Sequence, residues 1–377
     1  MEHDDAARPG SPLSVIDPGP EVNTLLTLQD RHISTHVWNT CEDPNANDRV
    51  INVRHAVTHN HLDILEEIQP WLMQAGFYHV ARLRNHEIDH HLVSALVERW
   101  RPETRTFHMT MGEVTITLED VHHLLGLPTD GQVVSGRHGR HPFKDLYRDF
   151  LGVQPTAGRD LNGGLLGLHY LWEKFKDYAD HTGNEVDRRR YTRALILQIL
   201  GGMLFVDTAS SFVPAKYLLY LDDFQRCGTY SWGSTVLALL YKELCKVTDR
   251  RRSNMGGCAL LLQLWVWTRF PTISPPLPEV IDEYAIYGAR FNIYDQRHTV
   301  FNHIRRYRHH MDVMRRRQCR WRPYLGVTHN VPHCHPFFGM LSSSTDNRRY
   351  DFDKPLSTFS YHFSLRLLCD FFPYNIV

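Results

Sequence analysis

His86, Glu87 and His90 stand in the spacing H-E-x-x-H, which on a helix is the zinc-binding signature of a large class of metalloproteases. In such a site both histidines bind zinc from one helical face, and the glutamate is the general base for a zinc-bound water. Asp89 is a good N-cap for the apolar helical segment that follows, which would leave Glu87 in a loop ahead of the helix. Asn85 is the competing cap, and a helix that begins there would put both histidines on one face.

The abundance of histidine weakens this zinc hypothesis. The chain holds 25 histidines in 377 residues, so an accidental match is expected in roughly one such chain in ten. Val93 and Leu96 also occupy the positions where the metzincin motif requires Gly and His. Surface or capping histidines are therefore favoured, and a zinc metallohydrolase at His86, Glu87 and His90 is the second and weaker alternative function.

A second group of metal-binding residue types spans 329–335, HNVPHCH. Histidine and cysteine three or four residues apart can ligate zinc, yet no partner pair follows downstream at finger spacing. A polar loop is the favoured interpretation.

Local positive charge is concentrated in residues 297–323, where nine arginines accompany a single acid, Asp312. The planar guanidinium fork suits phosphate, and the interleaved Tyr307 and Trp321 could stack on bases. The commoner interpretation is a basic amphipathic helix whose apolar stripe docks on the core while its arginines stay in water. The arginines expected to contact nucleic acid, if it is bound, are Arg305, Arg306, Arg308, Arg315, Arg316 and Arg317.

Composition limits the classes of protein that the chain can belong to. Lys plus Arg and Asp plus Glu both number 42, so net charge gives no whole-protein attraction to nucleic acid or to an anionic membrane. The most apolar run, residues 256–267, is shorter than the roughly 20 residues that span a bilayer, and we expect no membrane segment. Seven scattered cysteines, never in C-x-x-C spacing, favour a reducing compartment.

Other catalytic signatures are missing from the sequence. It contains no G-x-x-x-x-G-K-[ST] phosphate loop, no G-x-S-x-G nucleophile elbow and no G-x-G-x-x-G after a strand.

The elements that must position these residues begin with a strong helix signal. Thr117 and Asp120 form a capping-box pattern that opens a helix over LEDVHHLL, and Gly126 ends it. Just before it, EVTIT at 113–117 alternates like a short strand.

Helical periodicity continues through most of the remaining chain. The segments 191–205 and 258–270 are apolar nearly all round, which is typical of the central helices of a sizeable core. The expected fold class is therefore mainly α, a single large helical domain with at most a minor β-hairpin or small sheet. The helices expected after residue 130 are 167–179, 191–205, 234–247, 258–270 and 299–318.

One long passage carries a resemblance to a known family. Residues 95–136, ALVERWRPETRTFHMTMGEVTITLEDVHHLLGLPTDGQVVSG, resemble the hallmark of the plant mobile domain, also called the aminotransferase-like plant mobile domain. This domain occurs in MAIN-like proteins and in long-form homologs of serine/threonine-protein phosphatase 7. The similarity continues, in order, through 195–205, 217–245, 256–271 and 307–324.

The resemblance implies a plant mobile domain at 22–325. The Pro-rich residues 1–21 cannot bury enough apolar surface to order themselves, so we expect a disordered lead. Residues 326–377 replace the family's usual closing segment and are expected to be an atypical tail, as in a truncated or misjoined chain. Arg105 stands where the family pattern usually has His, so a role proposed for that histidine does not carry over.

The function implied by the resemblance is that of a non-enzymatic nuclear protein in transposon and chromatin silencing and meristem maintenance. It implies nuclear protein partners, among them a phosphatase 7-like protein, and no cofactor. The alternative is a transposon-derived DNA-binding protein that uses the basic 297–322 helix. Trp100, Phe107 and Trp265 are favoured as core. The residues expected to define the family's fold or partner surface are these three together with Glu103, Glu119, Asp120, Tyr230 and Trp232.

The enzyme names attached to the family lack support in this sequence. Aminotransferase chemistry needs a lysine that forms a Schiff base with pyridoxal phosphate, and Lys216, Lys242 and Lys246 stand in no recognisable cofactor setting. Phosphatase chemistry needs metal-binding Asp, His and Asn blocks, and the nearest string, residues 183–185, lacks the histidine.

Overall fold

A computed structural model describes most of the chain between residues 26 and 325. The lead at 1–21, the cluster at 329–335 and the tail at 326–377 lie outside the described residues. The described ranges are 26–40, 48–53, 61–83, 87–135, 142–158, 160–177, 184–207, 211–277, 286–291, 300–301 and 303–325.

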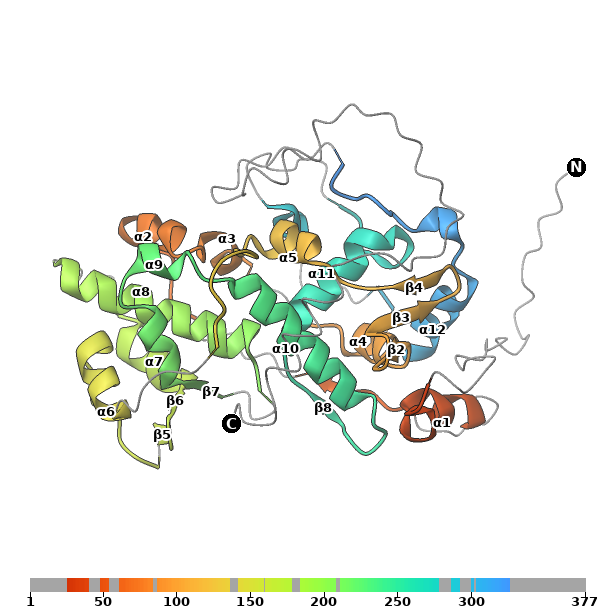
Figure 1. Cartoon of the computed structure of the whole chain (residues 1–377), viewed down its shortest axis with the longest axis horizontal. Helices are drawn as coiled ribbons and strands as arrows, with labels where there is room; N and C mark the ends of the chain where they lie inside the picture. The colour runs from red at the N-terminus through yellow and green to blue at the C-terminus, as the bar shows by residue number, and fades with distance from the viewer. Residues whose placement is uncertain are drawn as a thin grey trace, which may run out of the picture.

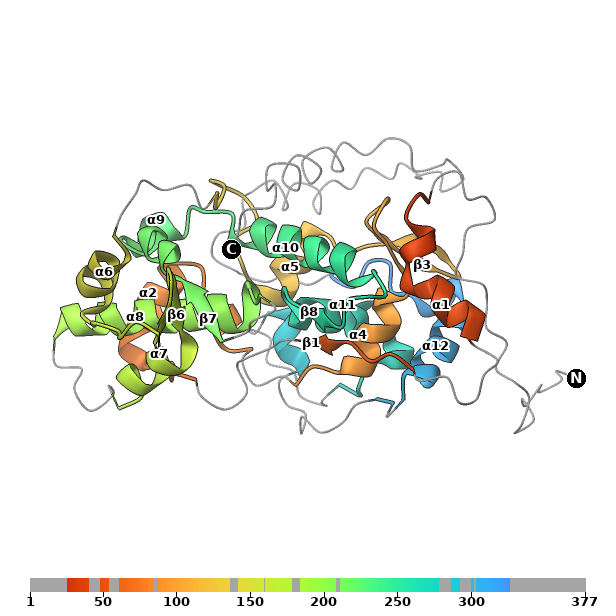
Figure 2. The same cartoon turned by 90° about the horizontal axis from the view of Figure 1, so that it is seen from below.

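The helices fall into two neighbouring groups (Figures 1 and 2). One group, together with α3 (Tyr78–Ala81) at its inner side, comprises α2 (Gln69–Gln74), α6 (Phe143–Leu146), α7 (Leu168–Phe175), α8 (Glu185–Ile199) and α9 (Phe224–Cys227). The other comprises α1 (Ile33–Thr40), α4 (His90–Val97), α5 (Leu118–Leu125), α10 (Trp232–Val247), α11 (Ala259–Arg269) and α12 (Ile304–Val313). The expectation of a mainly α fold is confirmed.

In the described ranges, three small sheets accompany the helices. The antiparallel order β2-β3-β4 joins Trp100–Arg101, Thr106–Met109 and Gly112–Val114, and a second sheet joins β5 (Leu161–Asn162), β6 (Leu165–Gly167) and β7 (Phe212–Pro214). The third pairs β1 (Asn52–Val53) in parallel with β8 (Asn254–Met255).

The strand expected at 113–117 is shorter in the structure. Only Glu113 and Val114 of this segment pair with β3. The chain then leaves the sheet, because the Tyr241 hydroxyl of α10 donates to the Ile116 carbonyl at 2.6 Å and lies 2.6 Å from the Thr115 hydroxyl. A tertiary hydrogen bond therefore ends this strand.

Short helical turns connect the longer elements. Among those that the structure describes, η3 (Tyr147–Leu151) and η5 (Leu200–Leu204) are π turns, and the second continues α8. The three-ten turns are η1 (Gln29–Arg31), η2 (Glu66–Ile68), η6 (Ala215–Tyr220), η7 (Pro271–Ile273), η8 (Tyr287–Phe291) and η9 (Arg316–Gln318).

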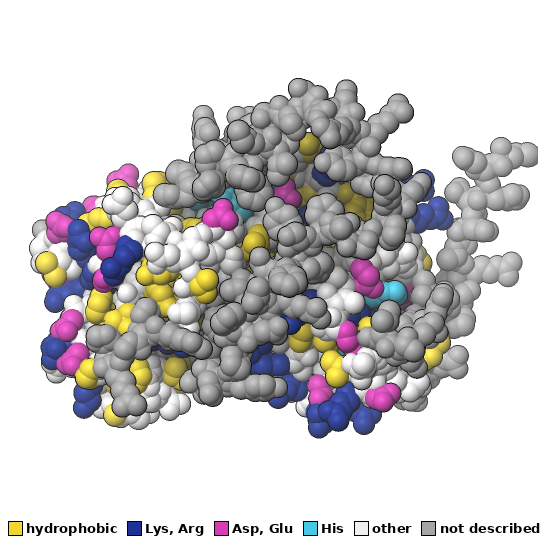
Figure 3. Space-filling view, in the orientation of Figure 1, with side chains coloured by type: hydrophobic (Ala, Val, Ile, Leu, Met, Phe, Trp, Pro, Cys, Tyr) yellow, Lys and Arg dark blue, Asp and Glu magenta, His cyan; other side chains and the backbone are white. Residues whose placement is uncertain are grey.

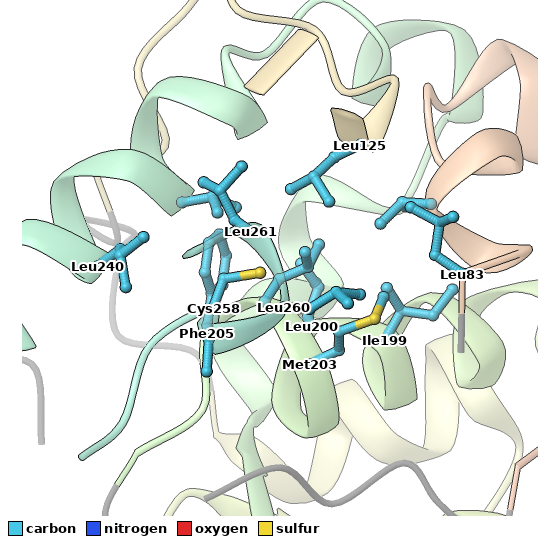
Figure 4. Close-up of a cluster of buried hydrophobic side chains, with 14 of the residues drawn as sticks. Leu83, Leu125, Ile199, Leu200, Met203, Phe205, Leu240, Cys258, Leu260 and Leu261 are labelled. Atoms are coloured by element: carbon cyan, nitrogen blue, oxygen red, sulfur yellow. The ribbon is translucent and has the colours of Figure 1, made fainter. Parts of the chain in front are cut away.

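Part of the core forms where the apolar later part of α8, continued by η5, meets helix α11. Figure 4 shows Ile199, Leu200 and Met203 of the α8–η5 rod converging with Leu260 and Leu261 of α11. All five are fully buried, and each leucine or isoleucine contributes roughly 1.5–3 kcal/mol by leaving water. The prediction that the segments 191–205 and 258–270 are central helices is confirmed.

The last predicted helix is divided in two. The helix expected over 299–318 is wrong in its length, since α12 ends at Val313 and Met314 is extended, with φ −65 and ψ 131. The Thr110 hydroxyl, at the turn after β3, donates to the Met314 carbonyl. This contact holds Met314 out of helical geometry, and the short turn η9 follows.

No helix among the described residues is long and apolar enough to cross a membrane.

Candidate functional site

The H-E-x-x-H segment is divided by a helix cap. The Asp89 carboxylate accepts hydrogen bonds at 2.9 Å from the backbone N–H groups of His91 and Leu92, and α4 begins at His90. The prediction that Asp89 caps this helix is confirmed. Glu87 therefore precedes the helix, and its carbonyl accepts a 2.9 Å hydrogen bond from Gln263 of α11.

Of the two motif histidines, the structure describes His90. His90 is in the first turn of α4, where its Nδ1 accepts a 3.1 Å hydrogen bond from the Val53 backbone. His86 lies outside the described residues. Among the residues that are described, His, Cys, Asp and Glu form no group of three that could hold a metal ion.

The aromatic residues singled out from the family pattern lie inside the fold. Trp100 packs edge-on against Phe107 with ring centroids 4.8 Å apart, and Phe107 stacks on Trp265 at 5.2 Å. Trp232 is fully buried and donates its indole N–H to the Cys227 carbonyl at 2.9 Å. These four side chains stabilise the core, and a partner could reach none of them without unfolding the surface above.

Three further family positions keep contact with solvent. Tyr230 and Glu103 are half-buried, and Glu119 is exposed on the first turn of α5. The Glu103 carboxylate accepts a 2.8 Å hydrogen bond from the Leu28 backbone, so it has a structural role. Their assignment to a partner surface stays a prediction.

Asp120, the remaining family position, is the centre of a buried polar cluster. One carboxylate oxygen accepts hydrogen bonds from the Thr117 backbone and hydroxyl, both at 2.8 Å, which completes the predicted capping box. The other accepts from Arg269 at 2.6 Å and from the Tyr324 hydroxyl at 2.8 Å. Burial and then the Asp120 charge raise the pKa of Tyr324, which keeps the phenol a donor.

This cluster is suited to holding the fold together. A carboxylate that accepts from four separate groups, in a site with no exposed surface, has little capacity left to act as a base. It joins Thr117, Arg269 and Tyr324, which belong to three of the family-like passages. Arg269 and Tyr324 were not predicted, because nothing in their local sequence marks them as partners of Asp120.

The glycine-rich end of the longest family-like passage packs on another one. Gly233 donates its N–H to the Pro128 carbonyl at 2.7 Å, and the hydroxyls of Ser231 and Ser234 donate to the Thr129 carbonyl. Gly131 has φ +110, and a Cβ there would lie 2.1 Å from a backbone oxygen. The family pattern at these positions thus reflects packing between the backbone at 128–131 and the start of helix α10.

Two of the candidate nucleic-acid arginines face acids within the fold. Arg308 makes a two-pronged ion pair with Glu98, both contacts at 2.7 Å, and a third contact with Asp48 at 2.5 Å. Arg305 reaches the other oxygen of Asp48 at 2.7 Å. Burial raises the pKa of the Asp48 carboxyl, but hydrogen bonds from Arg308 and Arg305 outweigh it, and the pKa is lowered overall.

Further buried contacts hold the same helix against α4. Arg99, at the end of α4, forms a buried ion pair with Asp312, and the Tyr307 hydroxyl donates to Asp89. Tyr307 has no exposed surface. The proposal that Tyr307 stacks on bases is therefore wrong, because its ring faces the core and not the solvent.

The other candidate arginines lie on the surface. Arg306 is exposed on α12, and Arg315, Arg316 and Arg317 are exposed where α12 gives way to η9. Arg320 follows them and is exposed as well. Figure 3 shows Lys and Arg side chains at the edge of the molecule where Figure 1 draws this last segment in blue.

Trp321 lies among these exposed arginines. The residue is 46% exposed, and the Arg316 guanidinium lies 5.8 Å from the centre of its ring. Arg315, Arg316, Arg317 and Arg320 form no ion pair with a carboxylate of the described residues, in contrast to Arg305 and Arg308. The residues 315–321, here called the outer basic segment, are therefore the part of the described surface best suited to an anionic ligand.

Comparison with known proteins finds a matching family model and several related plant proteins. The family model described as plant mobile domain matches residues 76–360. MAIN-LIKE 2 of Arabidopsis thaliana is 34% identical over 317 residues, which cover 82% of this chain and 45% of that protein. MAINTENANCE OF MERISTEMS of the same plant is 33% identical over 251 residues, 64% of this chain and 49% of the relative.

An enzyme-like name occurs among the relatives too. The serine/threonine-protein phosphatase 7 long form homolog of Arabidopsis thaliana is 38% identical over 263 residues, 69% of this chain but 19% of that protein. The chain thus spans less than half of the length of each of these three relatives. No solved structure matches the chain.

Proposed function

The chain belongs to the plant mobile domain family, and from this premise we propose that it acts as a non-enzymatic interaction module in the plant nucleus. Its role on this proposal is in transposon and chromatin silencing and in meristem maintenance, exerted through protein partners. The observation that carries the proposal is the family match over residues 76–360, supported by a relative whose name refers to meristem maintenance.

The environment of Asp120 supports a role without catalysis. A family position with a buried carboxylate would be a natural candidate for a general base, but here its oxygens accept from Thr117, Arg269 and Tyr324. The similarity to the phosphatase 7 relative is to 19% of that protein, so its name carries no activity over to this chain. A phosphatase 7-like protein is instead proposed as a partner.

Affinity purification of the tagged chain from plant nuclei tests this function. We expect nuclear accumulation and the enrichment of nuclear proteins, among them a phosphatase 7-like protein. A matched control is the variant Asp120→Asn, which weakens the buried cluster and should reduce the recovery of partners that depend on the folded domain. Exclusion of the wild-type chain from the nucleus, or recovery of no nuclear protein above the tag alone, would contradict the proposal.

A second candidate function is DNA binding, favoured by the exposure of the outer basic segment. Four of the six arginines first considered, Arg306, Arg315, Arg316 and Arg317, are exposed. Arg305 and Arg308 are removed from this candidate function because their charges are already compensated by Asp48 and Glu98.

Duplex affinity measured across salt concentrations tests the second candidate. Each phosphate neutralised by an arginine lowers the slope of log affinity against log salt by about 0.9, through counterion release. We expect R315A/R316A/R317A to reduce this slope by about 2–3. The control R250A/R251A/R252A removes an equal charge from another exposed run and should leave the slope unchanged. A flat salt response of the wild type would remove the idea.

A further inference from the structure

We propose that Trp321 is a stacking platform for an unpaired base, and that the ligand of the outer basic segment is single-stranded nucleic acid. This inference rests on the second candidate function and specifies its ligand. The first observation is exposure: a tryptophan residue that is 46% exposed lacks much of the stabilisation that burial of so large an apolar side chain would give.

The backbone that carries Trp321 is fixed from the core. Arg269 donates from its guanidinium to the Trp321 carbonyl at 2.8 Å, and the Arg320 backbone N–H donates to the Arg269 carbonyl, also at 2.8 Å. Arg269 is itself held by the buried carboxylate of Asp120. The backbone of the exposed Trp321 is therefore joined through Arg269 to the buried Asp120 cluster.

The ring itself is oriented by two contacts with a single neighbour. The Trp321 indole N–H donates to the Arg316 carbonyl at 3.2 Å, and the Arg316 guanidinium lies over the ring. A side chain that is held in place before binding loses less conformational entropy when a ligand arrives. Trp321 is thus pre-organised although it is half in solvent.

Positively charged residues precede Trp321 in the sequence. Arg315, Arg316 and Arg317 come before it and Arg320 is next to it, all exposed. Guanidinium groups bind phosphate oxygens, and an aromatic ring among them can stack on a base of the same strand. This combination of a basic track and an aromatic platform is what proteins use to bind single strands without reading their sequence.

The exposed ring decides between single and double strands. In a duplex each base is stacked on its neighbours and paired, so only its edge is accessible in a groove. A single strand presents free base faces, and each base stacked on an aromatic side chain contributes substantially to affinity. An acidic peptide would use the arginines alone and would gain little from the indole.

Fluorescence anisotropy with the full chain and a labelled oligo(dT) or oligo(U) of about twelve nucleotides tests the proposal. The same label on a duplex of equal length and on poly-glutamate provides the comparison. We expect Trp321→Ala to weaken single-strand binding by about 5- to 150-fold, the effect of one lost base stack. Trp321→Phe should recover much of the loss, and duplex affinity should change less than about twofold.

Controls separate this inference from the function on which it rests. Trp321→Ala should keep the melting temperature of the wild type, which rules out loss of the fold as the cause. Single-strand binding that is indifferent to Trp321→Ala, or an equal loss for single strand and duplex, would overturn the stacking site while leaving the arginine surface in place. Binding of neither nucleic acid would overturn both. Tighter binding of poly-glutamate that depends on Trp321 would assign the surface to an acidic protein instead.

Discussion

The two halves of the arginine-rich segment have opposite environments although their compositions are alike. On α12, Arg305 and Arg308 point at Asp48 and Glu98, and Arg308 is among the most highly coordinated side chains of the fold. In the outer basic segment, Arg315 to Arg317 extend into solvent. A run of positive charge in the sequence is therefore not one surface, because acids contributed by other parts of the chain determine which charges remain available.

This difference indicates which property of the protein each half of the segment affects. Buried and paired guanidinium groups contribute to stability and would have to lose their partners in order to bind phosphate. Exposed groups contribute little to stability and are free to bind. Substitutions along the segment should accordingly change folding at one end and ligand binding at the other.

Arg308→Ala should give the largest loss of stability. The change leaves Glu98 buried without its cation, and breaking a buried ion pair in this way costs roughly 3–5 kcal/mol. We expect the free energy of unfolding, measured by urea denaturation, to fall by about that amount. Arg308→Lys should recover only part, because an ammonium group cannot contact both carboxylates with a planar fork. A free energy of unfolding equal to that of the wild type would contradict the assignment of a stabilising role to the paired arginines of α12.

Asp48→Asn should have the next largest effect, with a characteristic pH dependence. The folded pKa of Asp48 is lowered from 3.8 because the hydrogen bonds from Arg308 and Arg305 outweigh the effect of burial. A carboxyl with a depressed folded pKa stabilises fully above its unfolded pKa, and this contribution is lost as the pH falls through the folded pKa. Near neutral pH, the free energy of unfolding of the wild type should therefore exceed that of Asp48→Asn by roughly 1–3 kcal/mol.

The stabilities of the wild type and of Asp48→Asn should converge at acidic pH. Urea denaturation repeated at decreasing pH should show the gap in stability between wild type and Asp48→Asn beginning to narrow below the unfolded pKa of 3.8, and closing as the pH falls through the lowered folded pKa. A gap that is constant down to pH 2 would show that the Asp48 charge does not contribute to stability.

Arg305→Ala should have a smaller effect. Its side chain is 36% exposed and Asp48 keeps its contact with Arg308, so we expect a loss of about 0.2–1 kcal/mol. Added salt should reduce this loss further, since exposed pairs are screened. A loss as large as that of Arg308→Ala would place Arg305 in the interior and sharpen the boundary between the two halves.

R315A/R316A/R317A should have the smallest effect on folding. Each residue is exposed and free of described carboxylate partners, and such surface changes usually alter stability by less than about 0.5 kcal/mol. The melting temperature should stay close to that of R250A/R251A/R252A. A markedly lower melting temperature would mean that the outer basic segment supports the fold and is not free for a ligand.

Signals confined to a few neighbouring residues could be predicted from the sequence. The Asp89 cap and the Thr117–Asp120 capping box were predicted because both partners lie within three residues of each other. The central helices at 191–205 and 258–270 followed from their nearly continuous apolar character, and the structure buries them. Local physics determines these features, so one sequence contains them.

Features that depend on distant partners could not be predicted. Arg308 and Glu98 are 210 residues apart, and Asp120 and Tyr324 are 204 apart. Helical spacing alone likewise extended the last helix past Val313, because the contact of Met314 with Thr110 is tertiary. The largest difference between the predicted and the observed candidate site therefore concerns the arginines. The basic stretch was apparent in the sequence, but its division into a paired half and an exposed half depends on the fold.

The Asp120 cluster also has a consequence for synthesis of the chain. Arg269 and Tyr324 follow Asp120 by 149 and 204 residues, and ribosomes add about 5–20 residues per second, so the carboxylate waits roughly 10–40 s for its last partner. Its counterion, Arg269, is added after roughly 7–30 s, and until then burial of the Asp120 charge on helix α5 is unfavourable. The buried cluster around Asp120 can therefore be completed only after Tyr324 has emerged from the exit tunnel.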